Sequence, residues 1–215
     1  MAYPAGHRTA VKAKIIDSAR RLFNRHGFDN VSIHQIMAGA GLTHGGFYSY
    51  FRSKSDLYTE VLGCFFTDPN WKNCWEGVEV DLSSGNVGPQ VVRAYLSDQH
   101  FDDVENSCPM VAVPSYVMRS SKGVRRAFET VFKAMVSVLE RSMPKNGQPR
   151  HETAQAAVAL CVGGMILARA LADSALADEL RTACMAVALQ LGGWDQDVKS
   201  KNGKSETAAL RRSAS

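Results

Sequence analysis

The sequence predicts an all-α protein of about nine helices, in which an N-terminal trihelical head is followed by a larger helical domain. Three observations lead to this fold class. Apolar residues recur at helical spacing along most of the 215 residues, and no run alternates in the manner of a β-strand. Residues 32–54 contain two short segments of helical spacing separated by a break, which is typical of a helix-turn-helix. A hydrophobic content of 45% is enough to bury a sizeable core.

The head is predicted to begin with a long helix over residues 9–26. Val11, Ile15 and Ala19 lie on one stripe of a 3.6-residue period. Gly27 follows the last periodic residue, where glycine commonly ends a helix. The arginines on the opposite face are interpreted as a solvated surface rather than a phosphate clamp.

The two helices of the helix-turn-helix have their own start and stop signals. Ser32 and Gln35 form the pattern of a capping box for the first helix, and Thr43 stands where its side chain could cap the second. Gly41 supplies the positive φ that a sharp exit from the first helix needs. Ser53 then starts the next helix.

The second helix of the motif has a surface that suits DNA, because its outward residues are polar, small or hydroxyl-bearing. These residues are His44, Gly45, Gly46, Tyr48 and Tyr50. Each glycine costs about 0.5–1 kcal/mol of helix stability relative to alanine. One interpretation of the pair is a close approach of the backbone to base edges, which leaves part of the specificity to DNA shape. The alternative is that tertiary packing tolerates the pair.

Apolar stripes and the loops between them predict the remaining helices. They cover residues 53–66, 89–100, 108–118, 121–142, 150–172 and 176–191, with a short piece at 71–75. Residues 195–215 lack a sustained apolar stripe and are predicted to be a disordered basic tail. The predicted organisation is therefore a head over residues 1–53, a larger helical domain over residues 54–194, and the tail.

Charge is distributed unevenly along the chain. Residues 1–60 carry eight basic and four acidic side chains, residues 61–198 carry twelve and sixteen, and residues 199–215 carry five and one. A basic head on an acidic body fits a protein with one phosphate-binding end, although an uneven solvated surface is the alternative. No run of 18 apolar residues and no secretory signal are present, so we expect no membrane partner and a bacterial cytoplasmic location.

Two motifs in the head are specific enough to suggest a family. The first predicted helix ends L-F-x-x-x-G-F, and A-G-x-G-L-T-x-G-x-F-Y-x-x-F-x-S-K-x-x-L follows. With these motifs, residues 8–62 resemble the DNA-binding head of the tetracycline-repressor (TetR/AcrR) family of transcriptional regulators. The rest of the chain follows only the general plan of that family.

The resemblance implies that eight residues bind DNA. The family's third helix enters the major groove, which places His44, Gly45, Gly46, Tyr48 and Tyr50 there, with His44 the candidate for a base-edge contact. Tyr48 and Lys54 match residues that contact phosphates, and Ser32 and Thr43 are placed as phosphate-bonding caps.

The resemblance also implies a homodimer and an effector pocket. The last two predicted helices are rich in small side chains, and in the family the corresponding pair forms a four-helix bundle with its two-fold mate. The interface would include Leu160, Gly163, Gly164, Leu167, Leu180, Ala183 and Val187, although an intrachain core is the alternative. For the pocket of a small-molecule effector, our guesses are Trp75, Tyr116 and Phe132, residue types that are more often ordinary core.

The five cysteines form no C-x-x-C pair and show no metal-binding spacing with the six histidines, so neither a metal nor a cofactor is expected. Cys108 precedes Pro109 at a predicted helix start, where backbone dipoles favour a reactive thiolate; a small buried side chain is the commoner role. No catalytic motif is present, which argues against an enzyme.

Together these patterns predict a homodimeric repressor that binds a palindromic operator in double-stranded DNA and is released by a small-molecule inducer. Two alternatives remain at this point. One is a regulator that senses oxidants or electrophiles through Cys108. The other is an architectural DNA-binding protein without sequence specificity. The operator, the effector, the regulated genes and the choice between repression and activation stay open.

Overall fold

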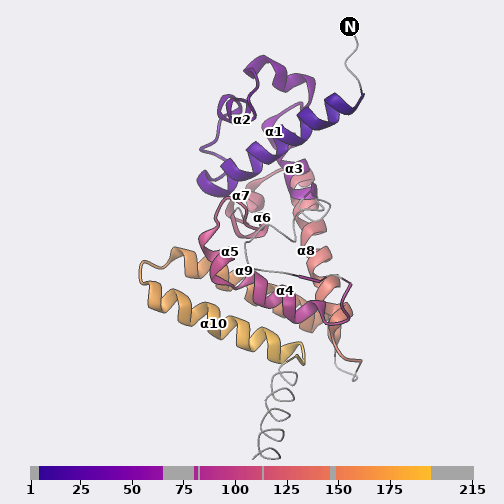
Figure 1. The fold of residues 1–215 in the computed structure, drawn as a ribbon, viewed down its shortest axis with the longest axis vertical. Coiled ribbons are helices and arrows are strands. Elements are labelled where there is room, and N and C mark those ends of the chain that lie inside the picture. The colour runs from indigo at the N-terminus through magenta and orange to yellow at the C-terminus, as the bar shows by residue number, and fades with distance from the viewer. Residues whose placement is uncertain (1–4, 65–79, 82, 113, 146–148, 195–215) are drawn as a thin grey trace, which may run out of the picture. The chain divides into compact units, whose positions relative to one another are not determined.

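The computed structural model describes residues 5–64, 80–81, 83–112, 114–145 and 149–194 (Figure 1). Within these ranges the protein contains ten α-helices, one 3-10 helix and no β-strand, which confirms the all-α class. The chain divides into two compact units. The first comprises Met1–Glu79 and Ser97–Met135, and the second comprises Val80–Leu96 and Val136–Ser215.

The first unit contains the helix-turn-helix and a later group of short helices. Its elements are α1 (Ala5–His26), α2 (Ile33–Gly39), η1 (His44–Ser49), α3 (Lys54–Cys64), α5 (Asp98–Asp102), α6 (Pro109–Ala112), α7 (Pro114–Arg119) and the first part of α8 (Lys122–Ser142). Residues 97–135 therefore belong to the same compact unit as the helix-turn-helix.

The core of the head forms where α1 packs on α2 and α3. Ile15 and Phe23 of α1, Ile36 of α2 and Phe47 of η1 are at most 1% exposed. These residues come from the apolar stripes that predicted the helices. Burying a side chain of this size contributes about 1.5–3 kcal/mol, so packing rather than helix propensity stabilises such short elements.

Two helices that are predicted as single pieces are each divided in the structure. The predicted helix over residues 89–100 consists of α4 (Val87–Tyr95) and α5, because the Ser97 hydroxyl accepts a hydrogen bond from His100 N at 3.2 Å and starts a new helix. The predicted helix over residues 108–118 consists of α6 and α7, and α7 begins at Pro114, a residue favoured at the first position of a helix.

The second unit contains α4, the last turns of α8, α9 (Arg150–Ala170) and α10 (Ser174–Leu191). Asp173 caps α10 by accepting hydrogen bonds from Ala175 N and Leu176 N at 2.9 and 3.2 Å. α9 and α10 lie side by side as a hairpin (Figure 1). They approach closely at Gly164, where an added Cβ would lie only 2.9 Å from Cys184 Sγ.

Among the described residues one helix, α9, is long and apolar enough to cross a membrane by length and composition. The core helix of a water-soluble protein passes the same test. Ala157, Cys161 and Ala168 of α9 are 0% exposed. Its hydropathy is therefore weak evidence for a membrane span.

Candidate nucleic-acid interface

The first helix of the motif and its exit turn have the predicted geometry. Ser32 Oγ accepts from Gln35 N at 3.2 Å, and Gln35 Oε1 accepts from Ser32 N at 2.8 Å, so both halves of the capping box are present. Gly41 has a φ of 71°, in the left-handed region that favours glycine. These local signals set the direction in which the chain enters η1.

The second helix of the motif differs from the prediction because it is a 3-10 helix of six residues. The Thr43 side chain makes no cap hydrogen bond, so the predicted side-chain cap is wrong. Instead, Gly46 N donates to the Thr43 backbone carbonyl at 3.1 Å. Two adjacent glycines weaken α-helical propensity, and the tighter 3-10 form is typical of such short pieces.

In the described part of the chain, no neighbouring atom excludes a side chain at Gly45 or Gly46. A Cβ added to Gly45 would meet no atom within 4 Å outside its own helix and neighbours. At Gly46 the nearest such atom would be Met37 Cε at 3.6 Å, an ordinary van der Waals contact. Intramolecular packing thus permits side chains at both positions.

The outward face of η1 displays His44 and Tyr48, both exposed, with 62% of Tyr48 accessible to solvent. The rings of His44 and Tyr48 are 6.3 Å apart in an edge-on arrangement. On the opposite side Phe47 and Phe51 are 0% and 2% exposed. The two buried phenylalanines fix which face of η1 points outward, as their four-residue spacing predicts.

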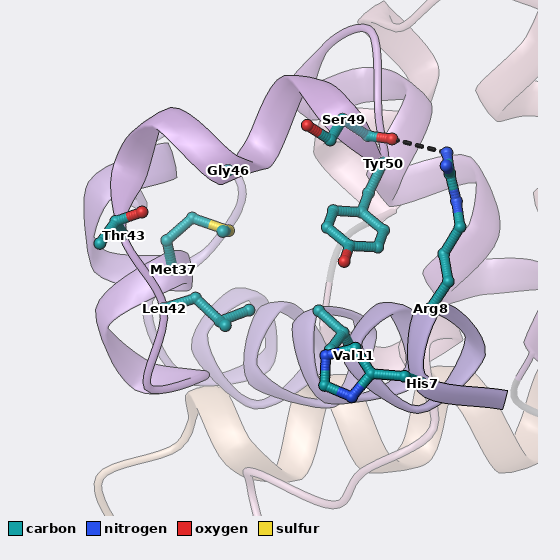
Figure 2. Close-up of a pocket in the computed structure, with 9 residues that line it drawn as sticks. All are labelled: His7, Arg8, Val11, Met37, Leu42, Thr43, Gly46, Ser49 and Tyr50. Atoms are coloured by element: carbon teal, nitrogen blue, oxygen red, sulfur yellow. Dashed lines mark hydrogen bonds between the residues drawn. The ribbon is translucent and has the colours of Figure 1, made fainter. Parts of the chain in front are cut away.

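Tyr50 lies differently from the other predicted groove-facing residues. It is half-buried, and Figure 2 shows its ring extending from the end of η1 toward α1. There it lines a groove of about 490 Å³ between α1 and the helix-turn-helix, together with His7, Arg8 and Thr43. Its hydroxyl therefore belongs to the groove rather than to the outward face.

Lys54, a predicted phosphate contact, is engaged within the head. Its ammonium donates to Phe28 O and Val31 O, both at 2.8 Å, and lies 4.3 Å from the centroid of the Phe28 ring. Burial lowers the pKa of this ammonium, and the charge of Asp29 partly offsets that effect. In this structure Lys54 joins the start of α3 to the loop before α2.

The arginine face of α1 is not only a solvated surface, contrary to the prediction. Arg20 donates to Glu105 O at 2.9 Å, and Arg25 pairs with the Glu105 carboxylate at 2.6 Å. Asn24 donates to Glu105 O and Ser107 O at 3.0 and 2.9 Å. The partners are about 80 residues away in the sequence, and no local pattern signals them.

Two of the three predicted ligand residues, Tyr116 and Phe132, lie in the described ranges. Tyr116 stacks on Phe28 with ring centroids 3.8 Å apart and meets the edge of Tyr58 at 5.5 Å. Phe132 is half-buried on α8, and Trp75 lies outside the described residues. The pocket stays a prediction.

Cys108 is 1% exposed, and its backbone N–H donates to His100 Nε2 at 3.4 Å. Burial restricts the access of an oxidant to this thiol, so the structure lends the sensor hypothesis no support.

The predicted dimer residues fall into two groups. Leu167 and Val187 are 58% and 45% exposed, Ala183 is exposed, and Gly163 is half-exposed. Gly164, by contrast, is buried inside the hairpin against Cys184. Leu160 and Leu180 are partly exposed beside the first group.

Comparison with known proteins identifies the head. Residues 15–61 match the family model described as bacterial regulatory proteins, tetR family, a segment that comprises the second half of α1, all of α2 and η1, and most of α3. The head of the chain is therefore a TetR-family helix-turn-helix domain. The HTH-type transcriptional regulator AcrR of Shigella flexneri is 43% identical over 74 residues, which are 34% of this chain and 26% of that protein. The match to the Bacillus subtilis regulator YfiR spans 27% of that protein. This chain therefore covers only about a quarter of the length of these two relatives.

Longer alignments extend the likeness beyond the head. The Bacillus subtilis HTH-type transcriptional regulator YdgC is 24% identical over 163 residues, covering 73% of this chain and 80% of that protein. The crystal structure of Escherichia coli NemR in its reduced form aligns over 83% of this chain and 95% of NemR, with a TM-score of 0.65 and 16% identity. The structural likeness establishes the all-helical fold of the family.

Proposed function

We propose that this TetR-family chain is a homodimeric transcriptional repressor that binds a palindromic DNA operator and releases it when a small molecule binds. The observation that supports this most directly is the outward face of η1. It presents His44, Gly45 and Tyr48 to solvent, while Phe47 and Phe51 hold the opposite face in the core. A helix held in this manner can enter a major groove with its polar face forward.

The glycines of η1 favour a close approach to the bases. A protein that needed only a stable helix would gain from alanine at Gly45, and the neighbouring atoms leave room for it. A backbone that approaches base edges or thymine methyls does not leave that room. Few side chains remain for direct readout, so DNA shape would supply part of the specificity.

A homodimer is supported by the α9–α10 hairpin. One apolar stripe runs along α10, and its successive members are four, three, four and four residues apart. Three of its members, Leu176, Val187 and Leu191, are 43–47% exposed. Exposed apolar stripes of this kind pack against a partner helix, and a two-fold dimer would present two heads to a two-fold operator. Adjacent major grooves require a spacing of about 34–36 Å between recognition elements.

Release by an effector follows from that spacing requirement. A small molecule that binds better to a state with another separation of the heads would shift the population away from the DNA-binding state. Such a protein functions in the cytoplasm, where DNA and metabolites are both available.

The test begins with selection of bound duplexes from a random DNA pool. The selected duplex is then titrated with the wild type, Gly45→Ala and a matched control, Gly63→Ala, an exposed helical glycine of α3 whose added Cβ also meets no atom within 4 Å. We expect a palindromic duplex, and we expect Gly45→Ala to bind it at least about tenfold more weakly while its thermal stability is unchanged or higher.

The control variant should bind DNA as the wild type does. Two results would refute the proposal: no duplex is enriched from the pool, or Gly45→Ala binds the enriched duplex with wild-type affinity. Enrichment without sequence preference would instead favour the architectural alternative.

A further inference from the structure

The C-terminal end of η1 is held by a residue from the start of α1. Arg8 Nη2 donates to the carbonyl oxygen of Ser49 at 2.8 Å, across 41 residues of sequence. The guanidinium carbon of Arg8 also lies 5.6 Å from the centroid of the Tyr50 ring. Figure 2 shows this arrangement, with Arg8 rising from α1 beside Tyr50 and the dashed bond reaching Ser49.

η1 has few other means of fixing its own ends. It is six residues long, contains two glycines, and follows an N-cap threonine whose side chain makes no cap bond. The last carbonyls of a helix have no donor within the helix, and a cation near them is favourable. Arg8 supplies both a donor and a positive charge at that end.

The next turn of α1 contacts the segment that follows η1. Lys12 Nζ pairs with Glu60 of α3 at 2.6 Å and lies 5.4 Å from the centroid of the Phe51 ring. Arg8 and Lys12 are one helical turn apart, so they project from the same face of α1. Side chains of one helix, α1, thus contact both the end of η1 and the corner that follows it.

We propose that Arg8 is a positioning residue for DNA recognition, which acts through the Ser49 carbonyl and the Tyr50 ring rather than through a DNA phosphate. Holding the end of η1 sets the direction in which His44 and Tyr48 face. Loss of this bond lets η1 adopt several orientations, of which only one fits the base edges. This inference rests on the proposed DNA-binding function.

The test compares three variants on two DNAs. Arg8→Ala removes the bond, Arg8→Lys keeps one donor and the charge, and Arg21→Ala removes an equal charge from an α1 side chain that pairs with Asp17 at 3.0 Å. Affinities for the selected duplex and for a random duplex are measured over a range of salt concentrations, and melting temperatures are recorded.

We expect Arg8→Ala to weaken the selected duplex about tenfold relative to Arg21→Ala. The random duplex should be bound equally by these two variants, and the slope of log affinity against log salt should be the same for both. Arg8→Lys should recover part of the loss, because its ammonium can donate to the carbonyl without reproducing the planar contact with Tyr50.

Different outcomes would overturn the inference. Equal weakening on both DNAs, with a slope shallower by about 0.9 for each lost contact, would mean that Arg8 binds phosphate itself. An affinity of Arg8→Ala equal to that of Arg21→Ala would mean that Arg8 does not position η1. A large fall in melting temperature that Arg8→Lys does not restore would mean a role in folding alone. If the wild type selects no duplex, the proposed function fails before Arg8 is tested.

Discussion

The helix-turn-helix and the α9–α10 hairpin are stabilised by different kinds of contact. In the head, bonds from side chains to backbone carbonyls fix elements that have little stability of their own, as Arg8 does for η1 and Lys54 for the loop before α2. In the hairpin, two long helices approach through small residues such as Gly164, with Cys184 filling the space opposite. A weak helix can therefore be oriented by specific polar bonds, whereas strong helices need only shape.

The two regions also leave different surfaces exposed. The head presents a polar face with His44 and Tyr48, which suits an anionic, hydrogen-bonding partner. The hairpin presents Leu167 and Val187, which suit another apolar helix face. If this comparison is right, mutations on the two surfaces should affect different steps: docking on DNA in one case and pairing of chains in the other.

The largest effect is expected from a charge on the apolar stripe of α10. Val187→Glu would place two carboxylates at a two-fold seam, so we expect a monomer in sedimentation experiments. The affinity for the palindromic duplex should fall by about 100-fold or more, because each head then binds alone. Thr182→Glu is the matched control, since Thr182 is exposed on the same helix but away from the stripe. A dimeric Val187→Glu protein would contradict the assignment of this face.

A smaller effect, on folding rather than pairing, is expected at the glycines of α9. Gly164→Val should lower the free energy of unfolding by about 1–3 kcal/mol, because a Cβ there would lie 2.9 and 3.0 Å from Cys184 Sγ and Cβ. Gly163→Val meets no atom within 4 Å at its Cβ and should change stability by less than about 0.5 kcal/mol in the monomer. Urea unfolding of both variants on the monomeric Val187→Glu background separates packing from dimerisation.

The sequence predicted most of what is locally encoded. The capping box at Ser32, the positive φ at Gly41 and the exposure of Tyr48 all follow from residues within a few positions of each other. The outward face of η1 was predicted for the same reason, since Phe47 and Phe51 alone decide which side is buried. The family of the head follows from the same short motifs.

The contacts that the sequence does not predict join residues that are far apart in the sequence. The contacts of Arg20 and Asn24 with residues 105–107, the bond from Arg8 to Ser49 and the stacking of Tyr116 on Phe28 join segments 41–88 residues apart. The 3-10 form of η1 is not predicted either, because a glycine pair weakens an α-helix without specifying which helix type replaces it. For the long-range contacts, the tertiary partner rather than the local pattern decides the geometry.

The smallest effect compares the two helix starts of the motif itself. Ser32→Ala removes a side chain that accepts from Gln35 N, and we expect a loss of about 1 kcal/mol in the free energy of unfolding. Thr43→Ala removes a side chain that makes no cap bond, so its cost should be a few tenths of a kcal/mol at most. Both residues are exposed and both are predicted DNA contacts, so DNA affinity alone would not distinguish them. Denaturant unfolding without DNA does: equal losses would mean that η1 is capped as α2 is, and that polar bonds from α1 are not what holds it.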